Sequence, residues 1–306
     1  MVPYILRRIV MLLPVLFGVT LVSFSLLHLV PGDPAEVLGG QEASKADIDR
    51  IRKEYGLDQP LVVQYARFVG NAVRGDLGIS IQSRHPVREL LLQRLAFTLQ
   101  LALASVLVAA ALGLLAGIIS STRQYSFFDT ASMLGALFGI SMPIFWLGLL
   151  LILVFAAKLQ WLPSGGTGSI RHLIMPAIAL GSASAAVIAR MTRASMLEVT
   201  RHDYIRTARA TGYRQRVIIF RHALKNAMIP VLTVFGLEFG SMLGGAVLTE
   251  TVFSLPGIGR LLVEGIFARD YPVVQGAMIL VASTFVLVNL LTDVAYAFFD
   301  PRIRYE

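Results

Sequence analysis

Asp203 to Pro230 read D-Y-I-R-T-A-R-A-T-G-Y-R-Q-R-V-I-I-F-R-H-A-L-K-N-A-M-I-P, a basic stretch between two long apolar runs. Good helix formers fill Tyr204 to Ala210, with Asp203 placed as an N-cap and Gly212 at the position just after a helix end. A second helical run is predicted from Arg214 to Met228, ending before Pro230. The pattern therefore predicts a helix-turn-helix hairpin at a membrane surface.

The composition of the whole chain is that of an integral membrane protein. Of 306 residues, 56% are hydrophobic and 15% are charged, and the mean hydropathy is +0.70. A soluble domain would have to be almost all core to carry this composition. We therefore predict an all-α integral membrane protein. There is no cysteine, which excludes disulfides and cysteine-ligated metal or redox centres.

Six apolar runs are long enough to cross about 30 Å of hydrocarbon, which takes roughly 20 helical residues. The fourth is rich in Gly, Ala and Ser, and such small residues favour close helix packing, so we expect it to be buried among the others. The predicted spans are Ile9–Val30, Phe97–Ser120, Ala131–Ala157, Leu173–Ala194, Ile229–Leu248 and Val273–Phe299.

Charge placement predicts the orientation of these spans. From Arg190 at the end of the fourth span through the connection to the fifth, the chain carries nine Lys or Arg residues against two acidic ones. Arginines also flank the first and last spans (Arg7, Arg8, Arg302 and Arg304). Because cytoplasmic loops are enriched in Lys and Arg, both termini and this connection are expected to be cytoplasmic. The first span lacks a cleavage site and is expected to be a retained anchor.

These features divide the chain into four parts. Residues 1–30 form the N-terminal segment and first span, 31–96 an extracytoplasmic helical region, 97–299 a five-helix core containing a cytoplasmic loop at 195–228, and 300–306 a cytoplasmic tail. Within 31–96, helices are expected at Asp47–Tyr55 and Leu61–Val73, with Gly56 and Pro60 as stop signals between them. This region is either a structural lid or spacer, or a surface for contact with a delivery protein or for substrate entry.

The basic stretch alone leaves three interpretations open. It is a stop-transfer element lying on anionic lipid, a nucleic-acid-binding arm, or a coupling element inserted into a partner protein. Its composition favours the first of these.

At these residues the chain resembles the inner-membrane permeases of bacterial ATP-binding-cassette (ABC) importers, in the branch that carries peptides, nickel and glutathione. The stretch from Asp203 to Pro230 is similar to that branch's version of the EAA loop, although Arg206, Thr207 and Ala208 stand where the general loop has Glu-Ala-Ala. Its spacing from Gly212 to Pro230 is also longer than in the general loop. Other landmarks occur in the family's order: L-V-P-G-D-P at 29–34, Y-G-L-D-Q-P at 55–60, G-D-L-G at 75–78, V-F-S-L-P-G-I-G-R at 252–260, R-D-Y-P at 269–272 and D-P-R-I-R-Y at 300–305.

The resemblance implies a six-span, type I importer permease in the bacterial inner membrane, forming half of a translocation pathway. It implies as partners a second homologous permease subunit, two P-loop ATPase subunits and an extracytoplasmic substrate-binding protein, with no nucleic acid. No G-x-x-x-x-G-K-[S/T] motif is present, so ATP and Mg are expected on the ATPase subunits and no cofactor on this chain. Residues assigned to ATPase coupling are Asp203, Tyr204, Arg206, Thr207, Ala208, Arg209, Ala210 and Gly212.

Substrate residues are less visible in the sequence. Glu238 and Asp293 are carboxylates within apolar runs, where charge is costly, so they line a polar path or serve in internal hydrogen bonding. Glu250 is interfacial on this view. The sequence shows no arrangement of catalytic residues and no metal-ligand spacing, and we do not expect the protein to be an enzyme. The alternative function is a self-sufficient secondary transporter or channel. Peptides are the default substrate, with dipeptides, oligopeptides, glutathione, nickel chelates and sugars all open.

Overall fold

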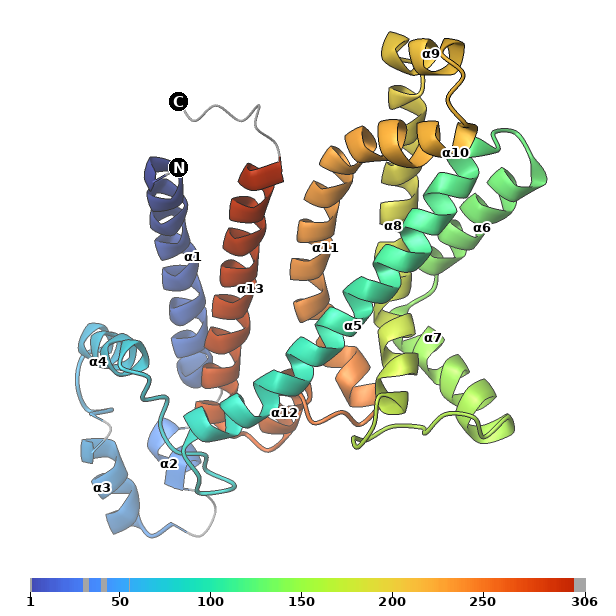
Figure 1. The fold of residues 1–306 in the computed structure, drawn as a ribbon. Coiled ribbons are helices and arrows are strands. Elements are labelled where there is room, and N and C mark those ends of the chain that lie inside the picture. Colours follow the sequence, from blue (N-terminus) through green and yellow to red (C-terminus); the bar gives the residue numbers. More distant parts are fainter. Residues whose placement is uncertain (1, 30–32, 40–42, 55, 300–306) are drawn as a thin grey trace. The chain divides into compact units, whose positions relative to one another are not determined.

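A computed structural model describes residues 2–29, 33–39, 43–54 and 56–299 (Figure 1). Every regular element in these ranges is a helix, apart from one isolated bridge between Ile79 and Pro86. The predicted all-α class is confirmed. The chain forms two compact units: unit 1 is Met1–Thr98 with Pro256–Val286, and unit 2 is Leu99–Leu255 with Leu287–Glu306.

Unit 1 contains the N-terminal helix and the short helices that follow it. Tyr65 of α4 fixes α4 against α1, because its ring packs edge-on against Phe17 and Phe24 at 6.0 and 5.5 Å and its hydroxyl lies 2.8 Å from the Thr20 hydroxyl. The helices are α1 (Val2–Leu29), α2 (Pro34–Gly39), α3 (Lys45–Glu54), α4 (Leu61–Val73) and α12 (Ile258–Phe267), with the first part of α5 (Val87–Thr122) and of α13 (Tyr271–Phe299).

The two helices predicted after the first span are present. α4 has the predicted bounds, and Gly56 adopts a φ of +65° in the turn before it. α3 begins two residues earlier than predicted because Ser44 caps it: the Asp47 amide donates to the Ser44 hydroxyl at 3.3 Å, and that hydroxyl donates to the Asp47 carboxylate at 2.6 Å. The Ser44 hydroxyl thereby holds the pKa of Asp47 below its ordinary value.

A buried carboxylate in unit 1 joins two of the sequence landmarks. Asp270, in R-D-Y-P, is 3% exposed and accepts a hydrogen bond from the Ser80 hydroxyl, just after G-D-L-G. It also accepts from the backbone amides of Ile81 and Gln82, each at 3.2 Å. One side chain therefore orders a loop that is about 190 positions away in the sequence.

Unit 2 is built around α8 (Arg171–Val199). The most apolar window of α8 is 61% buried, against 28–33% in the other long apolar helices, which confirms the expectation that the fourth run is buried. A Cβ at Gly113 or Gly117 of α5 would lie 2.7 Å or less from α8, so these glycines permit the close approach of the two helices. The remaining helices are α6 (Phe127–Ser141), α7 (Ile144–Leu151), the π-helix η1 (Ile152–Lys158), α9 (Asp203–Ala210), α10 (Gln215–Val217), the π-helix η2 (Ile218–Ala223) and α11 (Leu224–Val252).

Among the described residues, four helices are long and apolar enough to cross a membrane: Val87–Thr122, Arg171–Val199, Gln215–Val252 and the described part of α13. The predicted third span is not one straight helix. It breaks at Met142 and Pro143 into α6 and α7–η1, which bend by 105°, and a bent pair of this kind is a broken span or a re-entrant loop. Pro143 causes the break because its preceding residue is forced into an extended conformation. The described part of α1 includes a shorter apolar stretch, Leu13–Ser25.

The second helix of the predicted hairpin does not end before Pro230. Gln215–Val252 is one continuous run of 38 residues, with η2 near its start and Pro230 inside it. A proline removes only one backbone donor, and in an apolar bundle neighbouring groups accommodate the loss. The second arm of the hairpin is therefore the extension of a long apolar helix.

Candidate functional site

The basic stretch forms a compact hairpin at one end of unit 2 (Figure 1). Ile205 and Ala208 of α9 face inward and are 0% and 8% exposed. They pack against Met196 near the end of α8 and against Ile218 and Ala223 of η2. The contact joins α9 to the ends of two long apolar helices, so the predicted hairpin is confirmed and is anchored at both ends.

The first turn of α9 differs by one residue from the prediction. His202 is the N-cap and Asp203 is the first helical residue, and His202 makes no capping bond with its side chain. Asp203 still favours the helix because a carboxylate in the first turn interacts well with the helix dipole. Tyr204 stacks on His202 at 5.9 Å, and its hydroxyl accepts a 2.8 Å hydrogen bond from Asn226.

Gly212 ends α9 as the sequence predicts. Its φ is +80°, its amide donates to the Arg209 carbonyl at 3.1 Å, and the Tyr213 amide donates to the Ala208 carbonyl at 3.3 Å. These bonds are the Schellman pattern, in which a left-handed residue follows the helix. A Cβ at Gly212 would meet no atom within 4 Å in this chain, so the demand for glycine comes from the backbone angle.

The opposite face of α9 is exposed and polar. Arg206 and Asp203 form an ion pair at 3.6 Å, with 77% and 95% of their side chains exposed, so the pair contributes little to stability. Of the eight residues assigned to coupling, only Ala208 lies on the buried face. The other seven are exposed: Asp203, Tyr204, Arg206, Thr207, Arg209, Ala210 and Gly212.

The two carboxylates considered for a substrate path lie on α11 and α13. Glu238 is half-buried and accepts a hydrogen bond from the hydroxyl of Ser184 on α8. Nearby, the Thr292 side chain fills the space that a Cβ at Gly236 would need, so α11 and α13 approach closely there. The side chain of Asp293 lies outside the described residues. Glu250, expected at the interface near a span end, is fully buried within the protein.

Sequence reasoning missed an ion pair with a buried carboxylate in unit 2. Asp129, at the start of α6, is 5% exposed and is bound by Arg193 of α8 and Ser120 of α5. The signal for Asp129 was a lone carboxylate in an otherwise apolar run, F-F-D-T-A. Arg193 carried no separate signal because it was one of nine basic residues already explained by orientation in the membrane.

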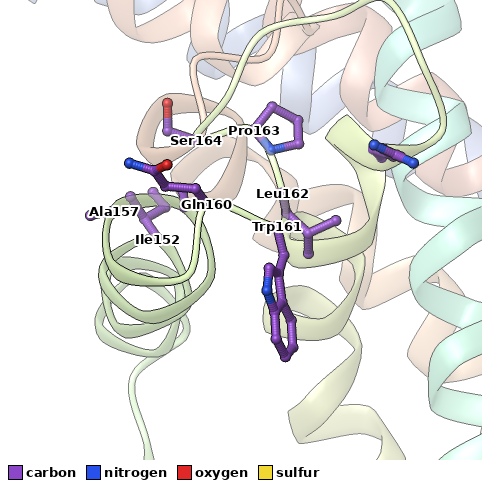
Figure 2. A pocket seen from close by; sticks show the side chains of 9 residues that line it. Ile152, Ala157, Gln160, Trp161, Leu162, Pro163 and Ser164 are labelled. Atoms are coloured by element: carbon purple, nitrogen blue, oxygen red, sulfur yellow. The ribbon is translucent and has the colours of Figure 1, made fainter.

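A pocket of about 580 Å³ lies at the other end of α8 from the hairpin (Figure 2). Figure 2 shows its labelled side chains coming from η1 and from the loop after it. At about 1.5 Å per residue, the 29 residues of α8 separate the pocket from α9 by about 43 Å. Its lining residues are Ile152, Ala156, Ala157, Gln160, Trp161, Leu162, Pro163, Ser164 and Arg171.

Long apolar helices with a charged helical hairpin at one end are the features of a multi-pass membrane protein. Residues 90–305 match the binding-protein-dependent transport system inner membrane component, and residues 1–102 match the N-terminal part of such membrane components. The chain belongs to this family of permeases. Its predicted family is thereby confirmed.

Individual relatives agree with this assignment. The chain is 47% identical to the dipeptide transport system permease protein DppB of Alkalihalophilus pseudofirmus and 46% identical to the glutathione transport system permease protein GsiC of Escherichia coli, in each case over 100% of both chains. Among solved structures, an inward-facing methionine ABC transporter, MetNI, gives a TM-score of 0.59 at 19% identity, covering 69% of this chain and 96% of that one. This likeness shows the permease fold.

Family membership fixes the general role of the chain. It is a permease subunit of a binding-protein-dependent ABC importer and lies in the inner membrane as a multi-pass protein. It is a transport subunit, not an enzyme, and ATP is hydrolysed by partner ATPases. A binding protein supplies the substrate to such a system.

Proposed function

We propose that this chain forms half of the translocation pathway of a peptide importer, for dipeptides, oligopeptides or glutathione-like substrates. A second homologous permease would supply the other half, and two P-loop ATPase subunits would drive transport. The support for the substrate class is that the chain aligns over its full length with permeases named for dipeptide and glutathione transport.

In this proposal the chain crosses the membrane six times, through α1, α5, the bent pair α6 and α7–η1, α8, α11 and α13, with both termini in the cytoplasm. Residues 31–96 lie on the extracytoplasmic side of the membrane. Residues 97–299 form the core and contain the cytoplasmic loop 195–228, and residues 300–306 form a cytoplasmic tail. The excess of Lys and Arg between α8 and α11 supports this orientation.

The coupling role of α9 rests on one observation above all. Its apolar face is packed onto the ends of two long apolar helices, while its charged face is exposed. An element of this kind transmits a push or pull because it moves as one body with the helices that carry it. Arg206 and Arg209 would form charge-assisted hydrogen bonds with carboxylates of the ATPase.

Glu238 and Asp293 complete the proposal as residues of the substrate path. A carboxylate there would favour the amino end of a peptide over an anionic solute. The hydrogen bond from Ser184 supports a fixed position for Glu238, since Ser184 is itself 4% exposed.

The absence of natural cysteine gives a direct test of coupling and topology. Thr207→Cys on α9 should cross-link to an ATPase subunit in native membrane, whereas Ser83→Cys, equally exposed but in unit 1, should not. A membrane-impermeant maleimide added outside spheroplasts should label Cys at 83 and leave Cys at 207 unlabelled. Outside labelling at 207, or purification of the chain without any ATPase, would refute the proposal.

A further inference from the structure

The ion pair between Asp129 and Arg193 has a fixed geometry. Arg193 donates from Nη2 to one carboxylate oxygen at 3.0 Å and from Nε to the other at 3.1 Å. Two parallel bonds between planar groups fix both the distance and the angle between the helices that carry them. Asp129 is 5% exposed and 30% of the Arg193 side chain is exposed, so solvent screens the pair only in part.

Asp129 also organises the turn between α5 and α6. The Ser120 hydroxyl donates to its carboxylate, the Tyr125 amide donates to it at 3.1 Å, and Arg193 Nε donates to the Ser120 hydroxyl at 2.7 Å. Tyr125 adopts a φ of +59°, which is uncommon for a non-glycine residue. One guanidinium on α8 therefore holds the end of α5, the start of α6 and the turn between them.

Arg193 is close to the coupling hairpin along the same helix. It lies ten residues before Asp203, and Met196, one turn further along α8, is 0% exposed in the cluster that contains Ile205. The apolar cluster joins α9 to α8, and the ion pair joins α8 to α5 and α6. Contacts from α9 thus extend to the helix that leads into the bend at Met142 and Pro143.

We propose that Asp129 and Arg193 are positioning residues that transmit movement of α9 to α5 and α6 during transport. This inference rests on the proposed coupling role of α9. A partly buried ion pair is a weak source of stability, since exposed pairs contribute little and well-packed apolar residues of similar volume often replace a buried pair without loss. Its directional, two-point attachment fixes the relative orientation of the helices more strictly than apolar packing does, because the hydrophobic effect is non-directional.

This difference defines the decisive variant, Asp129→Leu with Arg193→Met. It removes both charges together, so neither is left without its partner. The Tyr125 amide and the Ser120 hydroxyl lose an acceptor, so the thermal midpoint of the purified complex should fall by a few degrees while the complex still assembles. The assay reconstitutes the full importer with its ATPases and binding protein, and it measures ATP hydrolysed per peptide imported. We expect this ratio to rise by at least about fivefold, the lower end of typical coupling between sites.

Two further variants make the result interpretable. Arg193→Lys keeps the charge without the two-point geometry, so it should raise the ratio by less than the double variant. Arg190→Met removes an exposed arginine one turn earlier on α8 and should leave the ratio unchanged. The inference is overturned if the double variant or Arg193→Lys assembles and hydrolyses the wild-type amount of ATP per peptide imported. This holds also where uptake and hydrolysis both fall by the same factor, because the ratio is then unchanged. If the wild-type chain recruits no ATPase, it is the proposed function that fails.

Discussion

Gly212 offers the sharpest test of the coupling role proposed for the hairpin, through the series Gly212→Asn, Gly212→Ala and Gly212→Val. At a φ of +80°, an L-residue costs about 1–2 kcal/mol in the left-handed region, which is about a 5–30-fold change in a local equilibrium. Asn tolerates this region best among residues with a side chain, and a β-branched residue is the worst. Because a Cβ at Gly212 meets no atom within 4 Å of this chain, the cost falls on the turn and not on packing of the spans.

Uptake of labelled peptide into proteoliposomes, together with ATP hydrolysis, would measure this effect. We expect activity to fall in the order Gly, Asn, Ala, Val while the amount of inserted chain stays constant. Gly166 provides a matched control, since it has a φ of +87°, equally open surroundings, and a position at the other end of α8. Gly166→Ala should leave ATP hydrolysis per peptide unchanged. Equal uptake by Gly212→Val and wild type would refute the reasoning. An Asn variant as poor as Val would show instead that a partner surface excludes any side chain.

Three other predictions follow from buried contacts. Ile205→Ala removes a fully buried side chain from the hairpin and should destabilise it by about 2–5 kcal/mol, seen as loss of ATPase subunits on co-purification. Asp270→Asn leaves fewer acceptors for the donors from residues 80–82 and should destabilise this loop by about 1–3 kcal/mol. Tryptic cleavage at exposed Arg84 should therefore be faster, and an unchanged cleavage rate would show that Asp270 does not order the loop. Glu238→Gln should reduce uptake of cationic peptides more than of anionic ones, and an equal effect on both would remove Glu238 from the path.

The sequence predicted those parts of the fold that depend on local patterns. Helices α3 and α4, the buried fourth span and the left-handed Gly212 each follow from periodicity, small residues or turn chemistry within a few positions. Local patterns did not predict the effect of two prolines, Pro230 and Pro143. Pro230 lies inside a helix because surrounding helices support it, whereas Pro143 breaks one, and sequence alone does not distinguish these surroundings.

The parts that could not be predicted depend on pairing across long distances. Asp129 meets Arg193 after 64 positions, and Asp270 meets Ser80 after 190. Each partner has an ordinary local explanation as a helix-start carboxylate, a cytoplasmic arginine or a loop residue. The exposed face of α9 could be predicted from its spacing, but its anchoring by Met196 required the fold.

The π-helical stretch η2, at Ile218–Ala223, connects the hairpin to the long shaft of α11. Its wider turns accommodate one residue more than an α-helix would over the same length. Because the wider turn has absorbed that extra residue, deleting one residue from η2 would restore α-helical geometry and keep the direction of the hairpin relative to α11. The same deletion in the regular α-helical part of α11 would instead rotate everything on its N-terminal side by about 100°, since each α-helical residue turns the chain by that angle. The π-helical stretch is thus a place where related permeases could gain or lose one residue without changing the direction in which the arginines of α9 point.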